Sequence, residues 1–292
     1  MNQPSDCLSD TPGPGGSPTP QRLLIVTPTL GVSPYLDQTV RGITSLSIPF
    51  LHVISCPQPA IAQLAQRFPH ARVVADAGRE GAIYGAINAA LAAAGDEWEW
   101  FTYINDDDEL GPAFSETVRR HWASHDPEPV VYGEVRVIDE SDRTISFLSM
   151  ESRPEFIPAV LRSGLSPLNQ QGMIFRRDLV RELVGFNTQY KICADLDFWA
   201  RALAAGHGFR HYPVEMGRFR IRRGQISGDI HVTRGEQDEI ARRLFPHAGS
   251  WLQRTAARLR FRFCNLPRYL ARSRTVGWSS SEAILAGGKQ AA

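Results

Sequence analysis

The chain has 292 residues, of which 42% are hydrophobic and 22% are charged. A chain of this length can bury enough apolar surface to fold without a disulfide framework. Its 32 basic and 31 acidic residues leave a net charge of +1, which argues against a dedicated nucleic-acid-binding protein because such proteins usually carry a basic excess. The four cysteines, Cys7, Cys56, Cys193 and Cys264, form no C-x-x-C pair. This spacing argues against zinc and disulfide sites and favours a reducing compartment.

The N-terminal segment, residues 1–20, is rich in Pro, Gly, Ser and Thr. We expect it to be a disordered leader, because it has little apolar surface to bury. No stretch of the sequence approaches the roughly 18 uninterrupted apolar residues of a membrane span, and no signal-peptide pattern is present. We therefore expect a cytoplasmic protein.

Short apolar runs alternate with amphipathic stretches through the first part of the chain. We expect strands over residues 23–26, 51–54, 72–75 and 98–104, and helices over 36–43, 61–68 and 81–94. Such alternation is typical of βαβ crossovers and a mostly parallel sheet. The sequence therefore predicts an α/β, Rossmann-like fold with helices on both faces of the sheet.

The pattern becomes more mixed after residue 110. Paired strands are expected over 130–138 and 144–148, with a further strand over 172–175. Helices are expected near 155–162, 178–183 and 195–205, the last ending at Gly206. No internal repeat interrupts this second half, so we expect it to complete one domain with the first.

An acidic run, Asn105-Asp106-Asp107-Asp108-Glu109, directly follows the strand expected at 98–104. Ligands of parallel α/β sheets bind at the carboxyl ends of the strands. Adjacent carboxylates repel one another unless a cation or water screens them, and a hard divalent ion with a diphosphate is a common solution. The alternative is a solvated acidic turn, since Asp is also a turn residue.

A second candidate is Asp195, in the segment Ala194-Asp195-Leu196-Asp197-Phe198-Trp199-Ala200-Arg201. At the start of a helix, Asp195 can be a cap that the helix dipole stabilises. In the functional interpretation it is a general base that takes a proton from a hydroxyl. Asp197 and Arg201 are spaced as an ordinary i, i+4 ion pair.

Two loops complete the set of candidates. Thr27-Pro28-Thr29 leaves the first strand, either as a plain turn or as a loop that contacts a nucleotide. It has neither the G-x-G-x-x-G nor the P-loop pattern. The basic segment 219–227 contains Arg222 and Arg223, and is interpreted either as a loop that closes over phosphates or as a solvated strand end.

Taken in order, these motifs resemble those of the family 2 glycosyltransferases over roughly residues 23–227. The five matching motifs are Thr27-Pro28-Thr29, residues 79–88 (REGAIYGAIN), Asn105 to Asp108, residues 169–177 (NQQGMIFRR), and a two-part motif made of residues 184–187 (VGFN) and 193–201 (CADLDFWAR). No single motif is decisive, but five in order at plausible spacings are strong evidence.

The resemblance implies a GT-A fold, a nucleotide-sugar donor, inversion at the anomeric carbon and Mg2+ or Mn2+ as cofactor. Residues 21–110 are then the nucleotide-sugar-binding half and 111–250 the acceptor-binding and catalytic half. Matched by position, Asp195 is the catalytic base and Asp108, with Asp106, binds the metal. The residues expected on the nucleotide sugar are Thr27, Pro28, Thr29, Asp76, Arg79, Asn88, Asp106 and Asp107, and those expected on the acceptor or in the closing loop are Gln170, Gln171, Arg222 and Arg223.

The sequence departs from the family pattern at two of these positions. Cys56 follows the second strand, where relatives usually carry an acidic residue that contacts the base of the nucleotide. A thiol is a poor acceptor for a base N–H, so Asp76 or Arg79 is the expected substitute. Gln170 stands in place of a frequent His, which affects the contacts expected with the acceptor.

Residues 251–292 carry eight basic residues and one acid, Glu282. Leu252, Ala256, Leu259 and Phe263 repeat with helical spacing beside Arg254, Arg258 and Arg262. Such a basic amphipathic helix can lie on anionic lipid, pack on a partner, or dock on the mildly acidic body of the protein. We expect a glycan or lipid-linked acceptor, with peripheral contact at the inner membrane face.

Two other functions compete with sugar transfer. A sugar-nucleotide nucleotidyltransferase is also an α/β protein that uses a cation, but it needs a basic, glycine-rich loop after the first strand, and residues 29–33 contain no basic residue. A relative that binds a glycan or nucleotide without turnover is disfavoured by the presence of both Asp108 and Asp195.

Overall fold

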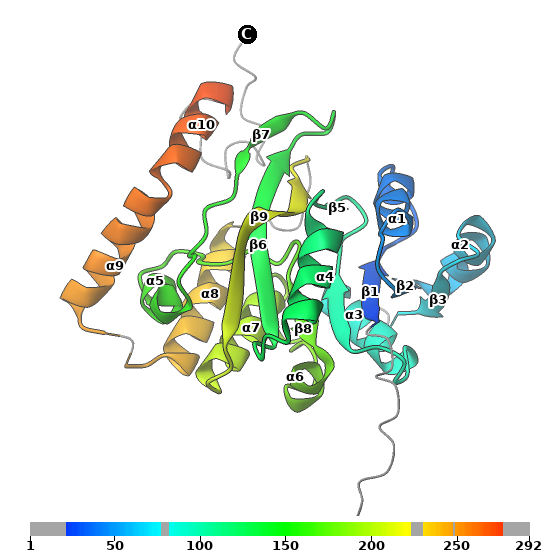
Figure 1. Ribbon diagram of the computed structural model, residues 1–292, viewed down its shortest axis with the longest axis horizontal. Coiled ribbons are helices and arrows are strands. Elements are labelled where there is room, and N and C mark those ends of the chain that lie inside the picture. The colour runs from blue at the N-terminus through cyan, green and yellow to red at the C-terminus, as the bar shows by residue number, and fades with distance from the viewer. Residues whose placement is uncertain (1–21, 77–81, 223–229, 248, 277–292) are drawn as a thin grey trace, which may run out of the picture.

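A computed structural model describes residues 22–76, 82–222, 230–247 and 249–276. These residues form one nine-stranded sheet in the order β3-β2-β1-β4-β8-β6-β9-β5, with β7 paired to β6 (Figure 1). The strands are β1 (Leu23–Pro28), β2 (Phe50–Cys56), β3 (Arg72–Ala75), β4 (Trp100–Tyr103), β5 (Glu109–Leu110), β6 (Val130–Ile138), β7 (Thr144–Phe147), β8 (Ile174–Arg176) and β9 (Phe209–Arg220).

The direction of the strands separates two parts of this sheet. β3, β2, β1 and β4 are parallel neighbours. β8 then runs antiparallel between β4 and β6, while β6 and β9 are parallel to each other. The predicted mostly parallel sheet is confirmed, and the exceptions β5, β7 and β8 all follow β4 in the chain. The carboxyl ends of β1, β4, β6 and β9 consequently lie along one edge.

Helices cover both faces of the sheet (Figure 1). One hydrophobic cluster joins α4 to β1, β4 and β8, and another joins α3 and α7 to the opposite face. The helices are α1 (Leu36–Thr44), α2 (Ile61–Arg67), α3 (Ala82–Ala93), α4 (Phe114–Ser124), α5 (Ile157–Arg162), α6 (Arg177–Glu182), α7 (Ala194–Ala204), α8 (Ile230–Leu244), α9 (Trp251–Cys264) and α10 (Leu266–Val276), with short 3-10 turns at Gln58–Ala60 and Pro154–Phe156.

Aromatic packing fixes α7 against the sheet. Phe198 of α7 stacks on Phe186, with ring centroids 4.7 Å apart, and meets Phe175 of β8 edge-on at 5.0 Å. Phe186 also contacts Tyr103 at the end of β4, at 5.5 Å. Because these rings interlock, the N-terminus of α7 is held beside the carboxyl end of β4.

The basic C-terminal segment docks on the body, and it does so through residues other than the expected apolar stripe. Ala257 and Phe261 of α9 pack against Val160 of α5, and α10 packs on β7. Ion pairs join Arg260 to Glu151 and Arg268 to Glu134. The docking alternative is therefore confirmed. The stripe of Leu252, Ala256, Leu259 and Phe263 faces away from the body, with Leu259 62% and Phe263 77% exposed.

Across the described ranges, no helix combines the length and the apolarity that crossing a bilayer would require.

Candidate active site

The acidic run leaves the end of β4 and reaches β5, and its three aspartates have different partners. Thr29 Oγ1 donates to Asp106 Oδ2 at 2.5 Å. Arg222 Nε donates to Asp107 Oδ2 at 2.6 Å. Thr29 and Arg222 come from the ends of β1 and β9, so three strand ends meet at this cluster. This convergence is what a parallel arrangement of strands produces.

Asp108 is the most enclosed of the three. The backbone N–H of Arg220 donates to its Oδ1 at 2.9 Å, and Gln171 and Asn105 donate to its Oδ2 at 3.0 and 3.2 Å. Burial, and then the charge of Asp107, raise the pKa of the Asp108 carboxyl to about 8. A bound cation would favour the ionised form and lower that pKa again.

Arg220 compensates much of the local negative charge. Its side chain is completely buried, with Nε donating to the carbonyl of Asp107 at 2.9 Å and Nη2 to Glu109 at 2.9 Å. The guanidinium also lies 4.3 Å from the ring centre of Tyr35. A buried arginine with this many partners holds the acidic segment in one conformation.

The donor set suits a hard divalent cation, although the carboxylates do not already form a cage. Among the residues that the structure describes, no three Asp, Glu, His or Cys side chains are arranged to hold a metal ion. Mg2+ is usually held by only one or two carboxylates together with substrate phosphates and water. Asn105 Oδ1 is buried here without a hydrogen-bond partner, and it adds an oxygen ligand of the type that such ions accept. The side chains present are therefore compatible with a bound Mg2+ or Mn2+ ion.

The loop after β1 contributes to the site through only one of its two threonines. Thr29 contacts Asp106, and its Oγ1 also accepts from the N–H of Gly31 at 2.9 Å. Thr27 is fully buried, with its hydroxyl 3.0 Å from His52 Nε2. The structure therefore assigns Thr27 to the interior of the sheet, whereas Thr29 lies at the candidate site. Pro28 continues β1 between them and is buried.

Asp76 directly follows β3 and lies beside Cys56 at the end of β2. It is one of the two residues that the sequence predicts in place of the acidic residue usual at the position of Cys56. Its N–H donates to the carbonyl of Cys56 at 2.8 Å, across the ends of β2 and β3. Burial, and then the charge of Asp76, raise the pKa of the Cys56 thiol to about 11. The thiol therefore stays protonated near neutral pH, and Asp76 supplies the carboxylate at this end of the sheet.

Asp195 lies in the first turn of α7. Its Oδ1 accepts from the N–H of Leu196 at 2.7 Å and from the hydroxyl of Tyr84 at 3.2 Å. Burial raises the pKa of this carboxyl to about 6. A carboxylate with that pKa is still ionised at neutral pH and is a stronger base than an ordinary aspartate. Cys193, the cap residue of α7, makes no side-chain capping bond.

The loop before Asp195 is fixed from α8. One carboxylate, Glu236, accepts the N–H of Lys191 at 2.8 Å, of Ile192 at 3.0 Å and of Cys193 at 2.9 Å. Three charge-assisted hydrogen bonds to consecutive residues leave that loop little freedom. The position of Asp195 therefore depends on α8, which follows it by about thirty residues in the sequence.

The acidic cluster and Asp195 act on the same side chain, Tyr103. Burial first, and then the charge of Asp195, raise the pKa of the Tyr103 phenol well above its ordinary value, and Asp108 acts in the same direction. Tyr103 ends β4, immediately before the acidic segment. Both carboxylates therefore act electrostatically on one phenol, although about ninety residues separate them in sequence.

Three other candidates have supporting roles in the structure. Asn88 donates to the carbonyl of Phe186 at 2.8 Å and accepts its N–H at 2.9 Å. Asn88 therefore binds this loop, and its expected contact with the donor stays a prediction. Gln170 donates to the carbonyl of Tyr103 and Gln171 to Asp108, and both are buried. They support the cluster instead of presenting their amides to an acceptor. Arg79 and Arg223 lie outside the described residues.

Sequence reasoning missed Tyr84, Arg220 and Glu236. Tyr84 lies within the matched segment 79–88, so the motif contained a signal for it. Arg220 was one of several basic residues in its segment, and only its complete burial distinguishes it. Glu236 is an ordinary acidic residue of an exposed-looking helix, and no local pattern indicates its partners.

The nine-stranded, mostly parallel sheet with helices on both faces is an α/β fold of the GT-A type. A family model described as "Glycosyl transferase family 2" matches residues 24–184, more than half of the chain, and the chain therefore belongs to that family. No significant match was found among curated proteins.

Solved structures agree on the fold. S. aureus TarS 1–349 in complex with UDP-GlcNAc is 17% identical, with a TM-score of 0.61 over 88% of this chain and 75% of that one. The complex of the same protein with UDP gives 0.57 over 88% and 74% at 17% identity. A mannosyltransferase from Pyrobaculum calidifontis in complex with GDP-Man and Mn2+ is 15% identical over 92% and 88%, but its TM-score of 0.48 is too low to support an argument.

Proposed function

We propose that the protein transfers a sugar from a nucleotide-sugar donor to a hydroxyl of a glycan or lipid-linked acceptor, with inversion. The observation that carries this proposal is the packing of α7, which contains Asp195, beside the end of β4, where the acidic cluster begins, through the rings of Phe198, Phe186 and Tyr103. Direct displacement needs a base and a diphosphate-binding cluster on either side of one reacting carbon, and the packing of α7 beside the end of β4 supports the proposal that Asp195 and Asp108 take these roles.

In this proposal Asp195 takes the proton from the acceptor hydroxyl as its oxygen attacks the anomeric carbon. The bond from that carbon to the donor phosphate oxygen breaks at the same time, and the nucleoside diphosphate leaves. Attack from the side opposite the leaving group inverts the configuration. Tyr84 orients the base through its hydrogen bond to Asp195, and holding donor and acceptor together removes much of the entropic cost of their encounter.

We propose that Asp108 and Asp106 hold Mg2+ or Mn2+ together with the donor diphosphate. The cation would stabilise the negative charge that grows on the departing diphosphate. Asp107 and Arg222 form an ion pair at 2.6 Å, so Arg222 is placed to move from Asp107 to a phosphate. Thr29 and Asp76 are the described residues that we expect to contact the nucleotide.

The test is release of nucleoside diphosphate from a panel of UDP-, GDP- and dTDP-sugars, with Mg2+ or Mn2+ and with a chelator. We expect one donor to be turned over, with the chelator, Asp108→Ala and Asp195→Asn each abolishing most of the release. Asp238→Asn, on the exposed side of α8, is the matched control. Release that survives Asp108→Ala combined with Asp195→Asn would overturn the proposal.

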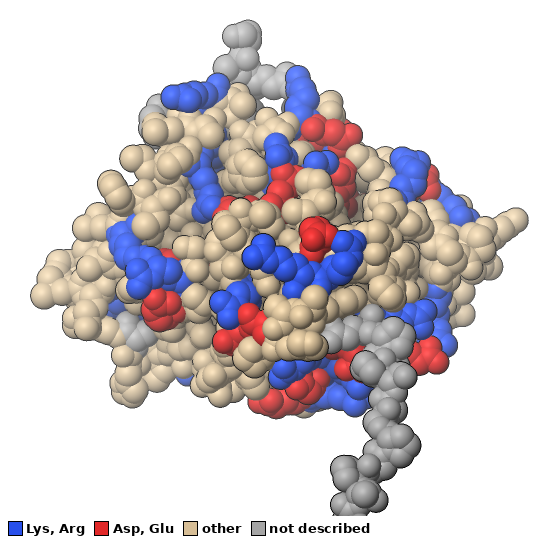
Figure 2. Space-filling model, in the orientation of Figure 1, with Lys and Arg blue, Asp and Glu red and all other residues tan. Residues whose placement is uncertain are grey.

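We further propose that α9 brings the protein to an anionic membrane surface. The outward stripe contains Leu252, Leu259 and Phe263, all exposed, and Arg262 is exposed beside it. Basic side chains are visible near α9 and α10 in Figure 2, while the rest of that face mixes both signs. Apolar side chains flanked by arginine are suited to the interface of an anionic bilayer. A lipid-linked acceptor would then be presented close to the enzyme.

A further inference from the structure

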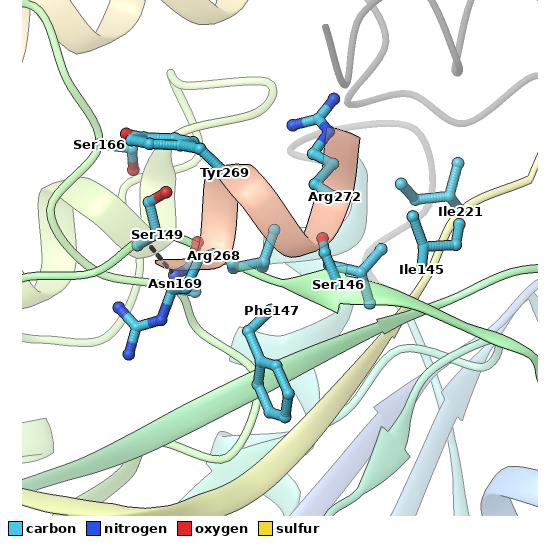
Figure 3. A pocket seen from close by; sticks show the side chains of 12 residues that line it. Ile145, Ser146, Phe147, Ser149, Ser166, Asn169, Ile221, Arg268, Tyr269 and Arg272 are labelled. Carbon is cyan, nitrogen blue, oxygen red and sulfur yellow. Dashed lines mark hydrogen bonds between the residues drawn. The ribbon is translucent and has the colours of Figure 1, made fainter. Parts of the chain in front are cut away.

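A cavity of about 200 Å³ lies between β7, the segment 166–169 and α10 (Figure 3). Its walls come from parts of the chain more than a hundred residues apart: Ser146 and Ser149 from and after β7, Ser166 and Asn169 from the loop before β8, and Tyr269 and Arg272 from α10. The cavity is distinct from the acidic cluster, and none of its lining residues has a role in the chemistry proposed above.

Two walls of the cavity continue directly into the candidate active site. Asn169 precedes Gln170 and Gln171, whose amides bind Tyr103 and Asp108. On the other wall, Ile221 lies between Arg220 and Arg222, which bind the aspartates. A molecule extending from the cluster along the carboxyl edge of β6 and β9 would therefore reach the cavity.

The lining has the chemistry of a carbohydrate site. Serine hydroxyls and the Asn169 amide offer hydrogen bonds, and the ring of Tyr269 offers an apolar face. Figure 3 shows this ring reaching from α10 towards Ser166, and the bond from Asn169 Nδ2 to the carbonyl of Ser149, 3.1 Å long, fixes the amide beside it. Few polar groups around an apolar floor are typical of small-molecule sites.

The charge of the lining favours an anionic ligand. Among the described residues that line the cavity, Arg268 and Arg272 are basic and none is acidic. Glu134 pairs with Arg268 from outside the lining and offsets its charge, so the net positive charge of the lining comes from Arg272. Guanidinium groups bind phosphate and carboxylate strongly because their N–H donors match those oxygens.

We propose that this cavity binds a sugar or polyol unit of the acceptor that carries an anionic substituent. This proposal rests on the proposed function, because the bound unit belongs to an acceptor only if the protein transfers a sugar. Binding to the cavity itself requires no turnover. The unit held here would be distant from the reacting hydroxyl and would select acceptors by charge.

The test uses the full chain and ligand-observed NMR, with glucose 6-phosphate as the probe and glucose as its neutral counterpart. We expect glucose 6-phosphate to bind more tightly than glucose, and Arg272→Gln to weaken it about tenfold, which is the loss expected for one charge-assisted hydrogen bond. Tyr269→Ala should weaken both probes. If Tyr269→Ala does not fold, the test relies on Arg272→Gln and Tyr269→Phe. Tyr269→Phe retains the ring, so we expect it to bind glucose about as well as the wild type does.

Arg274→Gln is the matched control, because Arg274 is exposed on the same helix and does not line the cavity. Equal binding of glucose 6-phosphate by the wild type and Arg272→Gln, or no binding by the wild type, would overturn the proposal. Asp108→Ala and Asp195→Asn should leave probe binding unchanged. Probe binding without any donor turnover would refute the proposed function and leave the site intact, so the two failures are distinguishable.

Discussion

The hydroxyl oxygen of Tyr84 lies 3.2 Å from Oδ1 of Asp195 and 2.5 Å from the carbonyl oxygen of Ile192. A phenol has one proton to donate, so it holds either the carboxylate or the loop that precedes it, and both fix the base. Burial, and then the charge of Asp195, raise the pKa of Tyr84 well above its ordinary value. The phenol therefore remains a donor over the whole range in which the enzyme would work.

Replacing this phenol tests its positioning role. We expect Tyr84→Phe to lower kcat about tenfold and to raise the pKa of Asp195, because a hydrogen bond to the ionised carboxylate favours that form. The measurement is the rate of nucleoside diphosphate release between about pH 5 and about pH 8. Unchanged kcat together with an unchanged acid limb would show that the bond does not position the base.

The pH profile of the wild type provides a separate prediction. The base is active when ionised, and burial raises the pKa of Asp195 to about 6. We therefore expect kcat/KM to fall about tenfold per pH unit below that value and to level off above it. The effect on stability has the opposite sign, since a raised pKa favours the folded state at low pH and this contribution is lost as pH rises through about 6. Asp195→Asn should abolish both the activity and this part of the stability change.

A third prediction concerns Glu236, which binds the loop before Asp195 from α8. Its charge is one of the contributions that raise the pKa of Asp195, after the larger effect of burial. We expect Glu236→Gln to lower kcat and to move the acid limb of the pH profile to lower pH. A loosened loop alone would lower kcat without moving the limb in that direction.

Glu239→Gln is the control for this experiment. Glu239 is on the same helix and accepts the hydroxyl of Tyr190 at 3.0 Å, so Glu239→Gln removes the same charge from α8 without touching the loop before Asp195. We expect it to leave the acid limb in place. Equal shifts in the two variants would attribute the effect to the general field of α8 and not to the contacts of Glu236.

The first half of the fold was predictable because local patterns there agree with the tertiary structure. β3 has the predicted bounds, and α3 begins and ends one residue inside the predicted range. β9 was not predicted, because its sequence, FRHYPVEMGRFR, is polar and contains a proline. It is a strand because it pairs with β6 along its length, with register shifts near Gly133 and Glu134. Long-range pairing of this kind has no local signal.

The candidate site shows the same limit. Asp108 and Asp195 could be proposed from motifs, because each motif is short and continuous. Their supporting partners come from other elements, as Arg220 and Glu236 do, and a single sequence contains no record of those contacts. Thr27 and Asn88 were assigned to the donor because they occur in the motifs, whereas their side chains are turned towards His52 and Phe186. Motifs identify a segment without fixing the direction of each side chain.

Gly172 tests how closely the backbone packs next to the acidic cluster. Gly172 follows Gln171 with a φ of +78°, and an added Cβ would lie 2.5 Å from the backbone of Met216. We expect Gly172→Ala to destabilise the protein by more than about 2 kcal/mol, from the left-handed backbone and the clash together. The measurement is the midpoint of denaturant unfolding, and a change below about 0.5 kcal/mol would contradict the tight approach.

Gly42, in α1, is the opposite case. Nothing lies within 4 Å of the Cβ that an alanine would add there. Alanine is the better helix former, so Gly42→Ala should raise the free energy of unfolding by about 0.5–1 kcal/mol. The two glycine variants make the same chemical change and should differ in sign.

The membrane proposal is tested best by substitutions on the outward face of α9. Deleting residues 251–292 would uncover Val160, against which Ala257 and Phe261 pack, so the deleted protein would be altered in more than lipid binding. Leu259→Ser combined with Phe263→Ser changes only exposed side chains. We expect the wild type to float with vesicles of phosphatidylcholine and phosphatidylglycerol, and the double variant to bind more than about tenfold more weakly, because each side chain loses about 1.5 kcal/mol or more of apolar burial.

Charge and exposure provide the controls for flotation. Arg262→Gln and added salt should each weaken binding, since attraction to anionic lipid is screened by ions. Val184→Ser changes a side chain that is 87% exposed in the loop after α6, away from α9, and should bind like the wild type. Equal flotation of the wild type and the Leu259 and Phe263 double variant would refute the proposed surface. Binding to phosphatidylcholine alone, unaffected by salt, would refute the role of the arginines, because only the apolar stripe would then be needed.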